Sequence, residues 1–267
     1  MTRYVKKYPV ATYVICCLVP VHVILWSALA TGASPESLQP LKLPFAILPS
    51  ITAFVLTFIS SGETGVAALA KQTFIRETPP WIYITGLLVF PLIGFAALGA
   101  RYFYDGYFPV SGDWKPWWMI IGASPFLLIV PGIFEEYGWR GFMQQRLQKR
   151  VNVFAASMLV GITWGSWHMM DFLTGNWLFE PMTVGVFFFY ITGVSILVGL
   201  FFNWSGGSVF VAMIVHFSSN LVNFFIPLWL LEPGVLTPLI FVGLIWVIVV
   251  ILFLGWLFGS AQDAGTR

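Results

Sequence analysis

The stretch PGIFEEYGWRGFMQQRLQKR, residues 131–150, decides how the rest of the chain is interpreted. It follows the apolar run WWMIIGASPFLLIV without a break, so Glu135, Glu136 and Arg140 lie where the chain enters or crosses lipid. A charged side chain at the middle of a membrane helix costs about 2.5–3.5 kcal/mol even on the mild insertion scale. These residues must therefore face protein or trapped water, and an acid in such a position points to function by default.

Composition assigns the whole chain to the membrane. Of its 267 residues, 58% are hydrophobic and 9% are charged, and the mean hydropathy is +0.86. A soluble domain carries roughly 25% charged residues. The 13 Trp and 26 Phe fit lipid-facing and interfacial surfaces. A formal charge of +2 is too small to suggest a nucleic acid as partner, so we expect the lipid bilayer and no nucleic acid.

Apolar runs predict about eight transmembrane helices, hence an all-α polytopic membrane protein that encloses a polar intramembrane site. The runs cover residues 9–30, 43–61, 81–103, 116–143, 151–172, 182–203, 208–230 and 236–259. The first run has spanning length, longer than the core of a signal peptide, and is expected to be a retained helix. Segment 62–80 is too polar to span and predicts a short helix at the cytoplasmic interface. We expect one integral membrane domain over residues 1–267.

The basic residues predict the orientation. With the N-terminus in the cytoplasm, nine of them fall inside and three outside, while Arg140 stays in the membrane. The inside set is Arg3, Lys6, Lys7, Lys71, Arg76, Arg146, Lys149, Arg150 and Arg267, and the outside set is Lys42, Arg101 and Lys115. We therefore expect a multi-pass protein of the plasma (inner) membrane with both termini in the cytoplasm.

Two further spans carry histidines with polar or aromatic neighbours at helical spacing. ITWGSWHMMDF places His168 one turn after Trp164, and FVAMIVHFSSNLVNFF places Asn220 one turn after His216 on the same face. The midpoint between Glu136 and His168 falls close to the basic loop, so an antiparallel pair of helices holds these two residues level. His216 follows the NWSGGS turn by about ten residues, which is roughly 15 Å along a helix. All three spans can thus bring their polar groups to one layer in the cytoplasmic half of the bilayer.

These groups are typical of a hydrolytic site. Glu135 can act as general base on a water molecule, and His168 can share that water or protonate the leaving amine. His216 and Asn220 can donate hydrogen bonds to a developing oxyanion. Glu135 lies about 100° around the helix from Glu136, so we expect the two carboxylates to have different neighbours.

Glu136 and Arg140 have the spacing and order of a helical ion pair, with the acid on the N-terminal side. We expect this pair to balance charge and to fix the rotation of the helix, which is most often a structural task. Two simpler interpretations stay open elsewhere: His168 bonded only to Asp171, and His216 with Asn220 as polar contacts between helices.

Three motifs in this order resemble the CPBP family, which comprises the type II CAAX prenyl proteases and the bacteriocin-processing or bacteriocin-immunity proteins. They are EExxxR (Glu135, Glu136, Arg140), an aromatic-xxx-His (Trp164, His168) and HxxxN (His216, Asn220). The string EEYGWRGFMQQRLQKR resembles the bacterial branch, and the similar core covers about residues 115–225. One departure is Trp164, because this aromatic residue is often Phe in the prenyl proteases.

The resemblance implies an intramembrane endopeptidase that cleaves a membrane-associated peptide or protein with a glutamate-activated water. It implies six catalytic or supporting residues: Glu135, Glu136, Arg140, His168, His216 and Asn220. Metal use in the family is argued both ways, and Glu135, His168 and His216 would suit zinc as a two-His-one-carboxylate set. We favour metal-free catalysis and expect no cofactor. The alternatives are a non-proteolytic scaffold or immunity-type protein and, less favoured because no inverted repeat is seen, a transporter with a proton relay.

Overall fold

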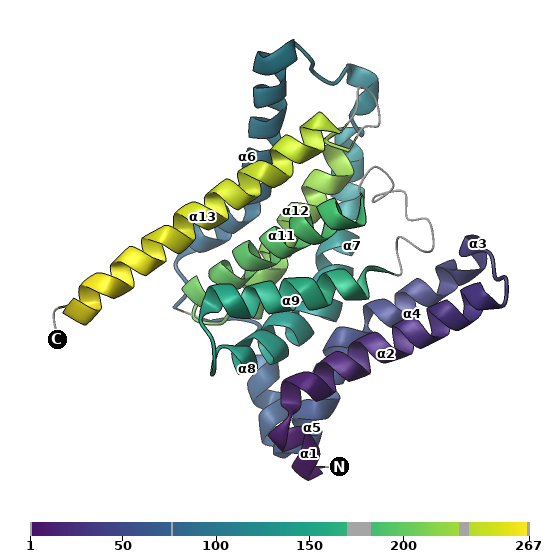
Figure 1. The fold of residues 1–267 in the computed structure, drawn as a ribbon, viewed down its shortest axis with the longest axis vertical. Helices are drawn as coiled ribbons and strands as arrows, with labels where there is room; N and C mark the ends of the chain where they lie inside the picture. The colour runs from purple at the N-terminus through teal and green to yellow at the C-terminus, as the bar shows by residue number, and fades with distance from the viewer. Residues whose placement is uncertain (1, 76, 170–182, 230–234, 266–267) are drawn as a thin grey trace.

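The computed structural model describes residues 2–75, 77–169, 183–229 and 235–265 (Figure 1). Within these ranges the chain forms helices and no strand, so the predicted all-α class is confirmed. Arg76, Asp171 and Arg267, which entered the predictions above, lie outside the described residues. The helices are α1 (Thr2–Lys7), α2 (Pro9–Ala30), α3 (Pro35–Leu38), α4 (Lys42–Ala46), α5 (Leu48–Lys71), α6 (Pro80–Asp105), α7 (Trp117–Glu136), η3 (Tyr137–Gln144), α8 (Gln145–Leu147), α9 (Val153–Trp167), α11 (Val184–Trp204), α12 (Val209–Phe225) and α13 (Leu236–Gly265), with short 3₁₀ turns at Gln39–Leu41 and Ser111–Asp113.

Each predicted span coincides with helix, but the helices differ in length. Six helical segments of the described chain are long and apolar enough to cross a bilayer. The other two apolar helices, α9 and α12, have 15 and 17 residues, fewer than the roughly 20 that a straight crossing needs. His168 directly follows α9 and His216 lies in α12, whereas Glu135, Glu136 and Arg140 lie in α7 and η3. The predicted site therefore joins two short helices to one long span.

Helix ends depart from the predictions where glycine or proline dictates the backbone. α5 continues to Lys71, beyond the predicted end at 61, with a break at Gly62. Gly62 has φ 63° and ψ −161°, a conformation open essentially to glycine alone. The helix expected within 62–80 is therefore a continuation of α5. Helix α12, which carries His216, ends at Phe225. The helix stops there because Ile226 precedes Pro227 and takes an extended conformation.

Helix α11 lies at the centre of the molecule and contacts α9, α12 and α13 (Figure 1). Small residues let it approach α9 closely: a Cβ on Gly161 would lie 2.8 Å from Cα of Thr192 and 2.9 Å from Cβ of Ser195. Such close contacts between small residues are a common means of packing membrane helices. The rigid centre formed in this way supports the polar residues of the neighbouring helices.

Candidate active site

The two glutamates lie at the point where an α-helix becomes a π-helix. α7 ends at Glu136, and η3 continues from Tyr137 as a π-helix of eight residues. A π-helix uses i→i+5 hydrogen bonds, and such segments are frequent at functional sites. The hydroxyl of Ser50 donates to the carbonyl of Ile133 at 2.8 Å, close to this transition. A Cβ on Gly138 would lie 2.6 Å from the carbonyl oxygen of Pro49, so only glycine allows α5 to approach η3 here.

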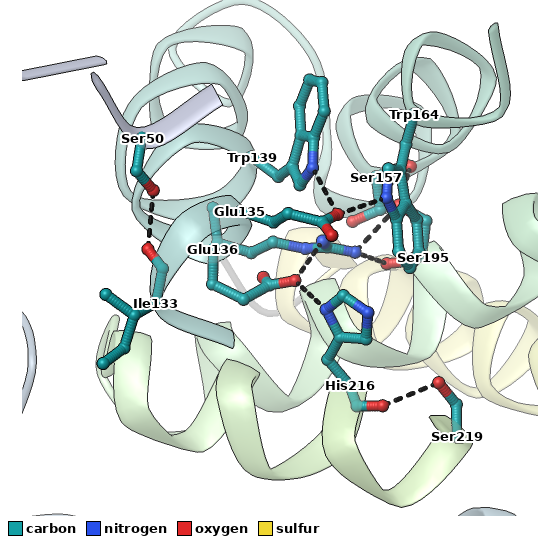
Figure 2. Close-up of polar contacts among 11 residues, drawn as sticks. Ser50, Ile133, Glu135, Glu136, Trp139, Ser157, Trp164, Ser195, His216 and Ser219 are labelled. Atoms are coloured by element: carbon teal, nitrogen blue, oxygen red, sulfur yellow. Dashed lines mark hydrogen bonds and ion pairs between the residues drawn. The ribbon is translucent and has the colours of Figure 1, made fainter. Parts of the chain in front are cut away.

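Glu136 is held by two cationic or potentially cationic partners (Figure 2). Arg140 Nη1 donates to Glu136 Oε1 at 2.9 Å, and both side chains are fully buried. This is the ion pair that the spacing predicted. His216 Nδ1 lies 2.7 Å from the same oxygen. Arg140 Nη2 in turn donates to the Ser195 hydroxyl at 3.2 Å. One carboxylate therefore joins three helical elements, α7–η3, α12 and, through Arg140, α11.

Glu135 has a different set of partners, as its rotation about the helix predicted. The indole Nε1 of Trp164 donates to Glu135 Oε2 at 2.7 Å, and the indole Nε1 of Trp139 donates to the same oxygen at 3.2 Å (Figure 2). Glu135 is only 4% exposed, so these donors satisfy a carboxylate that is almost wholly withdrawn from lipid and bulk water. Both donors are neutral, and they orient the carboxylate without cancelling its charge.

Trp164 is the aromatic centre of the site. Its ring centroid lies 4.8 Å from that of His216 and 5.6 Å from that of His168. The guanidinium carbon of Arg140 lies 5.3 Å from the same indole, within the range of a cation–π contact. Trp164 thus touches both histidines while its N–H holds Glu135. A Phe at this position could not make that hydrogen bond, because it has no N–H.

A cavity of about 260 Å³ brings four of the predicted residues together. Its lining includes Glu135, His168, His216 and Asn220. Glu136 and Arg140 are not among the described lining residues, so they support the cavity wall from behind. The wall also contains polar side chains that the sequence analysis missed, namely Tyr190, Ser219 and Asn223.

Three residues whose contacts the sequence analysis missed differ in how clearly the sequence indicated them. Trp139 follows Glu135 by four residues, which is the spacing of helical neighbours and was available as a clue. Asn223 follows Asn220 by three residues, and its amide donates to the Tyr190 hydroxyl at 2.8 Å. Ser195 had no such signal, because it stands alone in an apolar run and gains its role only from the packing of α11.

Within the described chain, no group of three or more His, Cys, Asp or Glu side chains is placed to hold a metal ion. Two of the three residues considered for zinc make other contacts in the structure. His216 Nδ1 contacts Glu136, and Glu135 Oε2 accepts from two indoles. These contacts use only His216 Nδ1 and Glu135 Oε2, so metal-free catalysis stays a prediction, and the mechanism proposed below uses no metal.

Fold and site together define a helical, multi-pass membrane protein with a buried carboxylate–histidine centre. Residues 114–222 match the sequence profile of the family described as type II CAAX prenyl endopeptidase Rce1-like. That segment contains all six predicted site residues. The resemblance predicted from the three motifs is therefore confirmed.

Two curated relatives are similar to part of this chain. CAAX prenyl protease 2 of Methanococcus maripaludis is 32% identical over 149 residues, which are 54% of this chain and 51% of the relative. Lysostaphin resistance protein A of Staphylococcus haemolyticus is 28% identical over 99 residues, which are 37% of this chain and 26% of that relative. The chain thus spans about half of the first relative and about a quarter of the second.

Proposed function

We propose that this protein is an intramembrane endopeptidase that hydrolyses a peptide bond of a membrane-associated peptide or protein. The observation that carries the proposal is the shared cavity: Glu135, His168, His216 and Asn220 line it, and they come from α7, the end of α9, and α12. The match of residues 114–222 to a family of endopeptidases, and the name of the Methanococcus relative, support the same reaction class.

Glu135 is the general base of the proposed reaction. Both indoles donate to its Oε2, and its other oxygen is the one available to a water in the cavity. Glu135 takes a proton from this water as the water oxygen attacks the carbonyl carbon of the substrate. The C–N bond then breaks, and the departing nitrogen receives the proton that Glu135 took, passed on through His168, so that a carboxylic acid and an amine are formed and Glu135 is again a carboxylate.

His216 and Asn220 stabilise the oxyanion that forms during the attack. A carboxylate can only accept, so the contact with Glu136 fixes a proton on His216 Nδ1. A second proton on Nε2 makes the imidazolium, whose charge Glu136 balances, and Nε2–H then donates to the oxyanion together with the Asn220 amide.

The substrate is presented from the bilayer, and we propose that it reaches the site in the cytoplasmic half. The excess of Lys and Arg on one side of the predicted topology supports a plasma (inner) membrane protein with both termini in the cytoplasm.

The test is cleavage of a membrane-peptide library by the purified protein, with prenylated and unprenylated peptides in separate arms. Glu135→Gln keeps the size and the acceptor for the two indoles but removes the base, so kcat falls about 10²–10⁴-fold. Glu63→Gln, at an exposed position of α5 away from the cavity, is the matched control and retains full activity. Unchanged cleavage by a folded Glu135→Gln variant would refute the proposal. A chelator arm tests the metal-free mechanism, which loss of activity together with bound zinc would overturn.

The name of the Staphylococcus relative supports a second candidate, a non-proteolytic membrane scaffold or immunity-type protein. Such a protein binds its partner through the same cavity without hydrolysis. Its biological effect then survives Glu135→Gln, whereas the effect of a protease is lost with the base. Measuring both peptide cleavage and the biological effect in the Glu135→Gln variant separates the two candidate functions.

A further inference from the structure

A second cavity, of about 720 Å³, lies where α1 and the start of α2 meet α5 and the α8–α9 turn. These segments are far apart in sequence, but α1 contacts α5, and α2 contacts α8 (Figure 1). Five basic residues line this cavity: Lys6, Lys7, Arg146, Lys149 and Arg150. None of the six residues of the candidate active site is among its lining residues, so it is separate from that site.

The charges of this basic cavity have no acidic counterpart in its wall. Among the described residues, no Asp or Glu lines it, and Glu63 of α5 is exposed outside it. Five positive charges around one hollow repel each other and create a strong positive potential there. An anion that enters the hollow relieves this repulsion, so the cavity is suited to a ligand with negative charge.

Two of the basic groups are held in place by aromatic rings. Arg146 donates to the carbonyl oxygen of Phe142 at 3.0 Å, and its guanidinium carbon lies 3.5 Å from the centroid of the Phe142 ring. The amine of Lys7 lies 5.0 Å from the centroid of the Tyr8 ring. Oriented cations lose less conformational freedom when they bind an anion than cations on free side chains do.

The basic cavity lies at the boundary of the apolar spans. The span of α2 begins at Pro9, and the span that contains α7 and η3 ends at Leu147, and both residues line the cavity. Tyr4 and Tyr8 lie nearby in tilted contact, with ring centroids 5.1 Å apart, and both are exposed. Aromatic residues of this kind mark the level of the lipid headgroups. The cavity therefore opens at the depth where phosphates of the bilayer are found.

We propose that the basic cavity binds the phosphate-bearing headgroup of an anionic membrane lipid. The cations contact the phosphate, and the apolar wall, which includes Val10 and Leu147, receives the adjoining glycerol and the start of an acyl chain. The N-terminal end of α2 adds to the attraction, because Tyr8 provides no side-chain cap and Val10 and Ala11 line the cavity. This site is independent of hydrolysis, so it stands or falls separately from the proposed protease activity.

The test measures lipid retained by the full-length protein in native mass spectrometry after exposure to phosphatidylglycerol in phosphatidylcholine. Neutralising one wall with Lys149→Gln and Arg150→Gln lowers the affinity for phosphatidylglycerol about fivefold for each cation removed. Lys6→Gln with Lys7→Gln removes the charges of the other wall and gives a similar loss of affinity for phosphatidylglycerol. Misfolding of one variant therefore does not decide the result. The control Lys71→Gln with Lys115→Gln removes the same charge from exposed positions outside the cavity and changes the affinity by less than about twofold.

Three outcomes overturn the proposal. An equal loss in the control pair means that the protein attracts anionic lipid diffusely, without a site. Displacement of phosphatidylglycerol by inorganic phosphate alone means that the cavity takes a free anion. Displacement by an acidic peptide, with no effect of the wall variants on lipid, assigns the cavity to a protein partner.

Discussion

Glu135 and Glu136 are neighbours in sequence, yet the structure places them in opposite electrostatic environments. Glu135 lines the cavity and accepts hydrogen bonds from two neutral indoles. Glu136 is 0% exposed and is bound by Arg140 and His216. Neutral donors position a carboxylate and leave its charge available, whereas a cation neutralises it. The difference fits the proposed division of roles, in which Glu135 is the reactive acid and Glu136 the structural one.

The largest effect on folding is expected when the charge of Glu136 is removed. Glu136→Leu leaves Arg140 buried without its partner, so the free energy of unfolding falls by about 3–5 kcal/mol. Glu135→Gln removes no such partner and costs about 1 kcal/mol or less. Thermal or denaturant unfolding in detergent measures both. The proposed difference between the two glutamates is refuted if Glu135→Gln lowers the free energy of unfolding as much as Glu136→Leu does.

A double variant sharpens this prediction. Glu136→Leu combined with Arg140→Met removes both charges and fills the space with apolar side chains, which restores most of the lost stability. Activity does not return with stability, because His216 still lacks the carboxylate that fixes its proton. If the double variant unfolds as easily as the single one, the cost lies in packing and not in an unpaired charge.

The next largest effect concerns the two indoles that hold Glu135. Trp164→Phe removes a 2.7 Å hydrogen bond to a carboxylate, worth about 1.5–3 kcal/mol, so kcat falls about 10- to 100-fold. Trp139→Phe removes a longer bond, 3.2 Å, and lowers kcat less. Cleavage rates of the two variants at matched folded fraction give the ranking. A larger loss in Trp139→Phe would reverse the assignment of the principal donor.

The smallest effect is expected at Ser195, which supports Arg140 from α11. Ser195→Ala removes the acceptor for Arg140 Nη2 and the donor to the Ser157 carbonyl, and it lowers stability by about 1 kcal/mol. Ser166→Ala is the control, because among the described residues that hydroxyl bonds within its own helix, to Ile162. Equal destabilisation by the two substitutions would show that Ser195 has no special role in holding Arg140 against Glu136.

The spans and the motif residues could be predicted from the sequence because lipid imposes a strong constraint. A helix that crosses hydrocarbon must be apolar, and the few polar residues within it must meet inside the protein. This reasoning indicated that Glu135, His168, His216 and Asn220 share one depth, and the structure brings them to one cavity. The ion pair of Glu136 needed only the i,i+4 spacing.

The π-helix and the second partner of Glu136 could not be predicted, because both depend on neighbouring helices. Hydropathy does not distinguish η3 from an α-helix. Its nearest sequence signal is Gly138, whose missing Cβ admits Pro49. Likewise, the bond from His216 to Glu136 requires a particular rotation of α12 against α7, which no local pattern specifies.

The short helix α9 has a consequence for the bilayer itself. Its 15 residues rise roughly 22 Å, while the hydrocarbon layer is roughly 30 Å thick. Met158, Leu159 and Ile162 are exposed on its outer surface and so face acyl chains. We therefore expect the lipid beside α9 to thin or to draw its polar groups inward, a case of hydrophobic mismatch. Water and a polar peptide backbone then have a shorter path to Glu135 on this flank than anywhere a full-length span meets the membrane.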